Sequence, residues 1–358
     1  MRFFGKLLAY PLLAVNIVAA LLFVFSCYGS LAAPVGRWPF ASLAGLAFPF
    51  LFILNLAFLI IWLLVWKKAA LLPVITFIAC ISPTLLYFPF HFTKSGSVEQ
   101  PFITVMTYNT EGFGTEDNKD SSTGNPVLQF ILGHNPDIII LQEATRDIIS
   151  KASRDKAIKT VYPYMNNDTG VSNLACISKF PIVGHEYIPF EKSNNGCLYL
   201  RILIGDDTLA LYNCHLQSIS LQAEELSEYR QFIEHPTDST HYDVSKKVIK
   251  KLLGSTSQRA GQARMIAERA KAETARFTIV CGDFNDTPLS YSHRVFDRFM
   301  NDAFAKSGVG MGITYHEHKL YYRIDHIFCS KNITPLHTWI DRTQKDSDHY
   351  PVITKIRF

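Results

Sequence analysis

Aspartate and glutamate are absent from residues 1–94, where only six lysines and arginines occur. Three stretches without any of these charges fill the region, at 7–36, 38–66 and 69–93. Each exceeds the roughly 20 apolar residues that carry a helix across a bilayer. We therefore predict three transmembrane helices. A buried core helix is the alternative for one stretch, but three in succession argue against it. Because the three stretches contain no Asp, Glu, Lys or Arg, they offer no charged residue for transport or a proton relay.

The few positive charges near the N-terminus predict an orientation in the membrane. Arg2, Lys6, Lys67 and Lys68 flank the apolar stretches, and such charges favour the cytoplasmic side. Three crossings then place everything after about residue 94 on the extracytoplasmic side, periplasmic or extracellular. The Ser-Leu-Ala-Ala sequence at 30–33 resembles a cleavage site, so the first stretch is alternatively a signal peptide. Its removal leaves the predicted side unchanged.

Strong positive charge is lacking in the rest of the chain. The first 94 residues hold six of the 35 lysines and arginines, so residues 95–358 hold the other 29 against all 31 acidic residues, a net charge of −2. This balance lacks the basic bias of proteins that grip long nucleic acids by their phosphates. The seven cysteines include no CxxC pair, so neither a zinc ribbon nor a thiol-redox site is supported.

The apolar pattern divides the chain into three parts. We predict a membrane region at 1–94, a short polar linker at 95–101 and a catalytic domain at 102–358. Within that domain, short apolar strands occur in pairs that are interrupted by helices, which indicates an α/β sandwich. Two long charged helices are expected at 221–234 and 244–273, and whether 221–272 covers the site as a lid stays open.

One segment, 279–288, is the most informative of the catalytic region. An apolar strand ends at a glycine, and Asp283 and Asn285 follow it. In an extended segment, residues two apart point to the same side. A carboxylate and an amide presented together at a strand end suit the activation of water against a phosphate.

Three other strand ends carry polar groups of the same kind. Asn109 follows one strand and suits a neutral ligand near a metal, with an Asx-turn as the alternative. Glu143 follows a run of branched aliphatic residues and suits a hard cation, with a helix-start charge as the alternative. His215 ends a third strand and could protonate a leaving oxygen, or it could be a satisfied core histidine.

Two more segments near the C-terminus complete the pattern. Asp325 alternates with apolar neighbours in a strand, where an acid is costly unless it is paired. Asp348 and His349 precede the last strand, and a carboxylate that holds a histidine fixes its tautomer; a turn is the alternative for these two. Six strand ends with such groups predict one metal–phosphate site.

Together these segments resemble the endonuclease/exonuclease/phosphatase superfamily, which has the deoxyribonuclease-like fold. The resemblance covers residues 104–358, and the motifs occur in the family's order: Tyr108-Asn109, Gln142-Glu143, His215-Leu216-Gln217, Gly282-Asp283-Phe284-Asn285, Arg323-Ile324-Asp325 and Ser347-Asp348-His349. It implies a four-layer α/β sandwich, with two mixed sheets face to face and helices outside. The site is then expected at one edge of the sheets.

The resemblance also implies a divalent cation. Glu143 would be the main Mg²⁺ ligand, with Asn109 beside it and Asp348 near the metal. Mn²⁺ is a possible substitute. Hard oxygen ligands of this kind are those that Mg²⁺ prefers.

The same resemblance assigns the catalytic roles. Asp283 would align and deprotonate the attacking water, and Asn285 would hold a phosphoryl oxygen. Asp325 would pair with His349, which would bind the scissile phosphate. His215 would lie across the phosphate, near the leaving group.

The motifs do not choose a substrate. The leading reading is a membrane-anchored phosphodiesterase or nuclease-type hydrolase. The alternatives are a phospholipid head-group phosphodiesterase of the sphingomyelinase type, or a phosphatase. Expected partners are the lipid bilayer and a phosphoester, whether nucleic acid, phospholipid or small molecule, and no protein partner is implied. An inactive binding protein on the same fold is a remote alternative.

Overall fold

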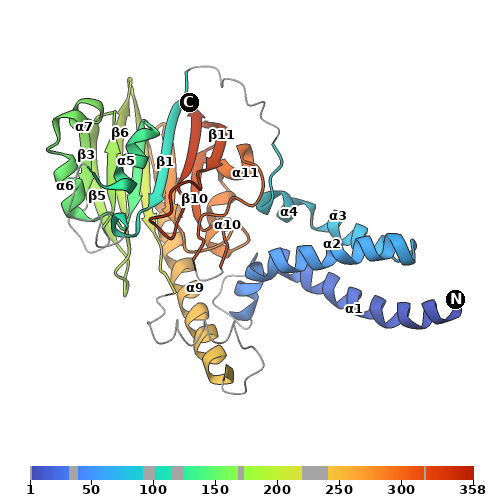
Figure 1. Cartoon of the computed structure of the whole chain (residues 1–358). Coiled ribbons are helices and arrows are strands. Elements are labelled where there is room, and N and C mark those ends of the chain that lie inside the picture. Colours follow the sequence, from blue (N-terminus) through green and yellow to red (C-terminus); the bar gives the residue numbers. More distant parts are fainter. Residues whose placement is uncertain are drawn as a thin grey trace.

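The computed structural model describes residues 2–31, 39–91, 101–114, 124–167, 173–219, 241–317 and 320–358. Figure 1 shows a body built on β-strands and a set of apolar helices that project from one side of it. The N-terminus lies at the far end of these helices, and the C-terminus lies in the body.

The first sheet has six strands in the order β11-β12-β1-β2-β4-β3. β1 pairs parallel with β2, and the other pairs are antiparallel. Its strands are β1 (Ile103–Asn109), β2 (Ile138–Gln142), β3 (Tyr164–Asn167), β4 (Ala175–Ser178), β11 (Thr334–Ile340) and β12 (Val352–Arg357). The sheet is therefore mixed, as predicted.

The second sheet also has six strands, in the order β5-β6-β7-β8-β10-β9. Here β7 and β8 form the one parallel pair among those described. The strands are β5 (Ile182–Pro189), β6 (Gly196–Ile204), β7 (Asp207–His215), β8 (Phe277–Asp283), β9 (Met300–Asp302) and β10 (Asp325–Ser330). In each sheet the parallel pair is central, so the carboxyl ends of β1, β2, β7 and β8 are available to form one site.

Three apolar layers hold the body together. The central layer lies between the sheets and includes Val105, Ile140, Leu200 and Ile279, all fully buried. The outer face of the first sheet is covered by α5 (Pro126–Gly133), α6 (Arg146–Ala152) and α7 (Lys156–Val161). That of the second sheet is covered by α9 (His241–Ala272) and α10 (Tyr291–Asp297), whereas α11 (Ala303–Ser307) packs beside β11. The predicted four-layer sandwich is confirmed.

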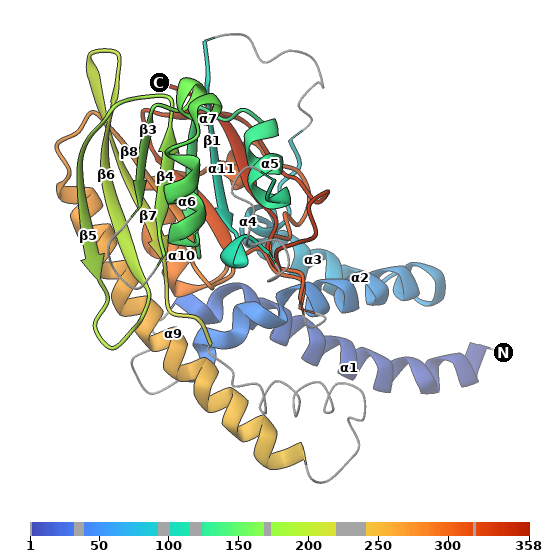
Figure 2. The ribbon, with the colours of Figure 1, turned by 60° about the vertical axis from the view of Figure 1, so that its left-hand side comes forward.

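The long helix α9 shows why a charged segment packs here. Its C-terminal half places Ala263, Ile266, Ala267 and Ala270 on one side, at the spacing of one helical face, and buries them against the second sheet. Figure 2 shows α9 running along the body and extending beyond it. The helix expected at 244–273 is therefore confirmed. The one expected at 221–234 lies outside the described residues, as do residues 95–100 of the predicted linker.

Two helices of the N-terminal region are long and apolar enough to cross a membrane, at Ala9–Tyr28 and Phe40–Val65. They belong to α1 (Arg2–Tyr28), and to η2 (Pro39–Ala47) together with α2 (Phe48–Val65); η1 (Gly29–Leu31) follows α1. Large apolar side chains of both helices are exposed, among them Leu21 and Leu64.

The third apolar stretch is not one continuous helix, so the expectation of three such helices is corrected. It is divided at Cys80 into α3 (Leu71–Ala79) and α4 (Ile81–Tyr87). Pro83 has no N–H to donate to the carbonyl four residues earlier. That carbonyl, on Ala79, accepts a hydrogen bond from the Tyr28 hydroxyl at 2.6 Å instead. The hydrogen bond from Tyr28 thus satisfies the carbonyl that the break in the helix leaves without an intrahelical donor.

The N-terminal region is docked on the body at several points. Ser30 Oγ donates to the Leu289 carbonyl. Tyr322 Oη donates to the Leu46 carbonyl at 3.2 Å, and Arg323 Nη2 donates to the Leu86 carbonyl at 2.7 Å. Leu289 also joins an apolar cluster with residues of α1, α2 and α4.

Candidate active site

Four strand ends meet at one edge of the sandwich. β7 and β8 run parallel in a register that sets His215 opposite Asp283, and the antiparallel β10 sets Asp325 on the other side of Asp283. Close approach of β7 and β8 depends on Gly282, whose φ is +128° and where a Cβ atom would lie 2.0 Å from the Cys214 carbonyl oxygen. No side chain larger than hydrogen fits there.

Asn213 holds the two sheets together beneath this edge. Its Oδ1 accepts from Gln142 Nε2 at 2.7 Å, and its Nδ2 donates to the carbonyls of Leu141 at 2.9 Å and Ala175 at 3.2 Å. Every partner lies on the opposite sheet. This buried amide therefore fixes the distance across the sandwich between the strand ends that carry Glu143 and His215.

Asp283 is the centre of the cluster and is 1% exposed. Its Oδ1 accepts from the backbone N–H of Asn285 at 2.8 Å, and its Oδ2 accepts from Asn109 Nδ2 at 3.1 Å. The Nε2 atoms of His215 and His349 each lie 3.7 Å from the same Oδ2. Burial raises the pKa of Asp283 above its usual value, although the charge of His349 opposes the shift. A more basic carboxylate is better suited to accept a proton.

His349 is oriented by Asp325. Its Nδ1 lies 2.8 Å from Asp325 Oδ2, and both side chains are buried. Burial alone would lower the pKa of His349, but the carboxylates of Asp325 and Asp283 raise it well above its usual value. The two carboxylates thus favour the charged form of the ring, and its Nε2 is turned toward Asp283. The ring of Tyr315 packs edge-on against it, with centroids 5.2 Å apart.

Asn285 does not continue the strand as the alternation argument predicted. β8 ends at Asp283, and Asn285 has a φ of +50°. The Asp283 side chain instead accepts the backbone N–H of Asn285, and Asn285 Nδ2 donates to the Leu216 carbonyl at 3.1 Å. The two residues remain adjacent in the site, but a turn, not an extended chain, brings them together.

Asn109 connects the centre of the site to Glu143. Its Nδ2 lies 3.1 Å from Glu143 Oε1 as well as 3.1 Å from Asp283 Oδ2. Glu143 has a φ of +51°, and its side chain is 44% exposed. Glu143 Oε1 lies 3.8 Å from His215 Nε2. The Glu143 carboxylate is thus both held by the buried amide and open to solvent.

A further acid, Glu111, is part of the site and was missed by the sequence reading. Its Oε2 accepts from the backbone N–H of Asp348 at 2.9 Å. Burial raises the pKa of Asp348 to about 7, and the negative charges of Glu111 and Glu143 act in the same direction. His349 Nε2 lies 4.0 Å from Asp348 Oδ1, but among the described residues no lysine or arginine pairs with Glu111, Glu143 or Asp348. Three carboxylates gathered in this way fit a hard divalent ion. The spacing of Asn109 and Glu111, two residues apart, was the available signal.

The buried group of Asp283, Asp325 and His349 also offers three metal-ligating atoms within 4.8 Å of one another. Two of these residues already satisfy each other through the Asp325–His349 hydrogen bond. The carboxylates of Glu111 and Glu143 accept hydrogen bonds only from uncharged groups, an amide N–H in each case, and with Asp348 they are the better candidates for a cation.

Arg259 of α9 is a second residue that the sequence reading missed. It is 3% exposed, its Nε lies 3.3 Å from Asp286 Oδ2, and its Nη1 donates to the Gln217 carbonyl at 3.0 Å. These two partners follow Asp283 and His215 in the chain. Arg259 thus fastens the two segments that leave the site to the covering helix.

An open cavity of about 260 Å³ adjoins the cluster. Its lining includes Glu143 and His215 of the cluster, together with the amides of Asn173, Asn194 and Asn195. Such a surface of amides suits a polar substrate group more than an acyl chain.

Comparison with known proteins identifies the family. The profile described as the endonuclease/exonuclease/phosphatase family matches residues 106–349, more than half of the chain. The chain belongs to the endonuclease/exonuclease/phosphatase family. It is therefore a metal-dependent phosphoester hydrolase by class, as the motifs predicted. Residues 6–87 match a second profile, described only as a domain of unknown function. No curated protein matches the chain.

Solved structures show the same fold at low sequence identity. TDP2 of D. rerio, complexed with a single-strand DNA product, aligns with a TM-score of 0.54 and 16% identity, over 72% of this chain and 100% of that one. The mannosyl-6-phosphatase of Bacteroides thetaiotaomicron VPI-5482 aligns with a TM-score of 0.50 and 17% identity, over 72% and 100%. A family protein from Beutenbergia cavernae DSM 12333 gives 0.51 and 15%, over 72% of each chain. These likenesses support the fold alone.

Proposed function

We propose that this chain is a membrane-anchored, Mg²⁺-dependent phosphoester hydrolase in which Asp283 activates the attacking water. The convergence of donors on Asp283 Oδ2 carries the proposal: Asn109 Nδ2 lies at 3.1 Å, and two imidazole Nε2 atoms lie at 3.7 Å. A buried carboxylate of raised pKa between two imidazoles suits proton transfer beside a phosphate.

The carboxylates of Glu143 and Asp348 would hold the cation, with Glu111 adding negative charge. Asn109 lies beside them, and its amide oxygen, which accepts the Glu111 backbone N–H at 3.1 Å, keeps a second lone pair for the ion. The raised pKa of Asp348 supports this fit: burial is its main cause, and a bound cation would offset both the burial and the repulsion that Glu111 and Glu143 add. When bound, Mg²⁺ neutralises charge on phosphoryl oxygens.

The remaining residues have distinct roles in the proposed reaction. Asp283 takes the proton of the attacking water. The charged His349, fixed by Asp325, binds a phosphoryl oxygen where negative charge develops. His215 stands on the other side of Asp283 and protonates the leaving oxygen. Asn285 exchanges its bond to the Leu216 carbonyl for a phosphoryl oxygen.

The N-terminal helices support membrane anchoring. Tyr10 packs against Trp66, with ring centroids 5.9 Å apart, so the start of α1 lies beside the turn that carries Lys67 and Lys68. The turn with Lys67 and Lys68 therefore lies at the end of the helices away from the body, as does the N-terminus, near which Arg2 and Lys6 occur in the sequence (Figure 1). Under the positive-inside rule this end is cytoplasmic, and the catalytic body is extracytoplasmic.

A membrane phospholipid is the second candidate substrate, because the N-terminal region contacts segments that flank the site. Leu289 lies six residues after Asp283 and bonds to Ser30, and Tyr322 precedes Asp325 and bonds to Leu46. Exposed aromatic side chains beside the site would favour a lipid substrate. Among the described tyrosines of 310–322, Tyr321 is 54% exposed, whereas Tyr315 and Tyr322 are half-buried. The amide-lined cavity favours a polar substrate instead.

A substrate panel tests the proposal. The full-length protein in lipid nanodiscs with Mg²⁺ would be given DNA, RNA, sphingomyelin, phosphatidylinositol species, sugar phosphates and a bis-aryl phosphodiester. EDTA and the Asp283→Asn variant are the controls. Metal-dependent cleavage that Asp283→Asn abolishes supports the proposal and names the substrate class. Cleavage that persists in that variant contradicts the role of Asp283.

A further inference from the structure

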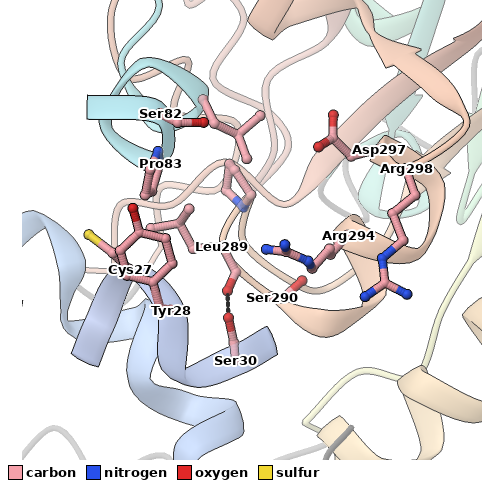
Figure 3. Close-up of a pocket in the computed structure, with 12 residues that line it drawn as sticks. Cys27, Tyr28, Ser30, Ser82, Pro83, Leu289, Ser290, Arg294, Asp297 and Arg298 are labelled. Atoms are coloured by element: carbon pink, nitrogen blue, oxygen red, sulfur yellow. Dashed lines mark hydrogen bonds between the residues drawn. The ribbon is translucent and has the colours of Figure 1, made fainter. Parts of the chain in front are cut away.

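A second pocket lies away from the hydrolytic site, where α1 and α4 meet the body. Its volume is about 180 Å³, well above the roughly 10–15 Å³ that one water needs. Tyr28, Ser30 and Ser82 line it from the N-terminal region, and Ser290, Arg294 and Arg298 line it from the α10 segment. Figure 3 shows side chains of both parts turned toward the same space.

The pocket has an excess of positive charge. Arg294 lies on α10 and Arg298 caps its C-terminal end, and Asp297 is the one acidic residue in the lining. The N-terminal region adds none, because residues 1–94 contain no acid. Burial lowers the pKa of Arg294, and the charge of Arg298 acts in the same direction. Burial and the neighbouring charge both disfavour the charged form of Arg294, and a bound anion would stabilise that form.

Arg294 also has an unmet hydrogen-bonding group. Its Nε is buried and has no hydrogen-bond partner among the described residues. A buried guanidinium N–H is costly to leave without an acceptor. The guanidinium fork matches the oxygens of a phosphate, and Arg298, which is exposed, can reach the same anion from the solvent side.

The position of the pocket indicates where the anion comes from. Tyr28 ends α1, and Ser82 lies in α4, so the pocket is at the end of the apolar helices that adjoins the body. If these helices cross a bilayer, that end is at the head-group level of the extracytoplasmic leaflet, where lipid phosphates lie.

We propose that this pocket binds the phosphate of an anionic phospholipid head group, held by Arg294 and Arg298. The inference rests on the membrane anchoring proposed above, but not on the hydrolytic chemistry. Ser290 and Leu289 belong to the segment that follows Asp283 and Asn285, so a bound lipid would fix this segment against the membrane region. The lipid here is a ligand that orients the body at the membrane surface.

Thermal unfolding of the full-length protein in detergent tests the pocket. The probes are dihexanoyl-phosphatidylglycerol, dihexanoyl-phosphatidylcholine and inorganic phosphate, each titrated separately. We expect phosphatidylglycerol to raise the unfolding temperature with a half-saturation below that of the other two. In Arg294→Gln/Arg298→Gln the half-saturation should rise about tenfold or more, because two charge-assisted contacts are lost. The matched control is Arg342→Gln, an exposed arginine elsewhere on the body.

Each outcome has one meaning. Loss of the phosphatidylglycerol effect in the double variant and in Arg298→Gln alone, but not in Arg342→Gln, supports the proposal; the single variant alters an exposed residue and leaves the packing intact. Equal stabilisation by inorganic phosphate would make the pocket a free-anion site and overturn the lipid assignment. If phosphatidylglycerol stabilises the double variant as strongly as the wild type, the pocket is not the phosphate-binding site. Hydrolysis of a soluble substrate, measured in parallel, reports on the catalytic proposal separately.

Discussion

His349 is held by Asp325 through a 2.8 Å contact between Nδ1 and Oδ2, and both side chains are almost fully buried. This contact fixes which nitrogen of the ring faces the reaction centre. Because Nδ1 is committed to Asp325, Nε2 is left to face Asp283 at 3.7 Å. The pair therefore presents a charged N–H at the position proposed for a phosphoryl oxygen.

Replacing Asp325 with asparagine tests this relationship. The amide keeps the shape but removes the negative charge that raises the pKa of His349. We expect kcat to fall about 100-fold, because a developing charge loses its fixed donor, while KM changes little. Steady-state kinetics on the best substrate of the panel measure both constants. An unchanged kcat would remove His349 from the charge-stabilising role.

Asp283→Asn separates chemistry from folding. The variant cannot accept the proton of the attacking water, so turnover should fall by about 10³-fold or more. Stability should be nearly unchanged, because the raised pKa shows that the buried charge is itself costly. Thermal unfolding and turnover are measured on the same preparation. Retained turnover would exclude Asp283 as the base.

Glu143→Ala addresses the cation. With its side chain 44% exposed, Glu143 contributes little to packing, so the variant should fold normally. The Mg²⁺ concentration for half-maximal activity should rise about 10- to 100-fold, in line with the loss of a metal ligand or its support. Glu191→Ala, an exposed glutamate in a turn, is the matched control. The same Mg²⁺ titration for wild type and Glu143→Ala would contradict the ligand role.

Sequence reasoning found the strand-end residues because their placement depends on local rules. Apolar runs predicted β2 and β8, and their ends carry Glu143 next to one strand and Asp283 at the end of the other. Parallel central strands then bring such ends to one edge of the sandwich. The family resemblance supplied the roles, which local patterns alone left open.

Contacts between distant segments could not be read in the same way. Glu111 meets Asp348 only because the chain returns 237 residues later, and Arg259 reaches the site only because α9 packs on the second sheet. The division of the third apolar stretch likewise depends on Tyr28, which satisfies the Ala79 carbonyl from another helix. Hydropathy depends on the composition of a segment, so it cannot predict contacts between distant segments.

Asp302 provides a test of acid stability away from the site. It is buried, accepts from His293 Nε2 at 2.8 Å, and caps α11 by accepting from the backbone N–H groups of Phe304 and Ala305. Burial alone would raise its pKa, but the His293 hydrogen bond and the charge of Arg323 hold the pKa well below its usual range.

A depressed carboxyl pKa stabilises the folded state above the unfolded value, and that stability is lost as the pH falls below it. The free energy of unfolding should therefore decline below about pH 4. Asp302→Asn should lower it by about 3 kcal/mol at pH 7 and flatten the decline. Denaturant unfolding at several pH values measures both, with the exposed Asp206→Asn as control. An equal decline in Asp302→Asn and wild type would assign the acid sensitivity to other groups.

The side of the membrane on which the body lies depends on whether α3 and α4 together cross the bilayer. They span 71–87, a rise of about 26 Å if helical throughout, against a hydrocarbon core of roughly 30 Å. We expect a phosphatase reporter fused after Phe358 to be active only outside the cytoplasm, and the same reporter fused after Lys68 to be inactive. Figure 1 places the turn before α3 and the body at opposite ends of the helices, so the two fusions should differ. If neither phosphatase fusion is active, and a cytoplasmic reporter is active at both positions, then α3 and α4 do not cross the bilayer. The body and Lys68 would then lie on the same side of the membrane, which would contradict both the extracytoplasmic placement and a lipid pocket at the head-group level of the outer leaflet.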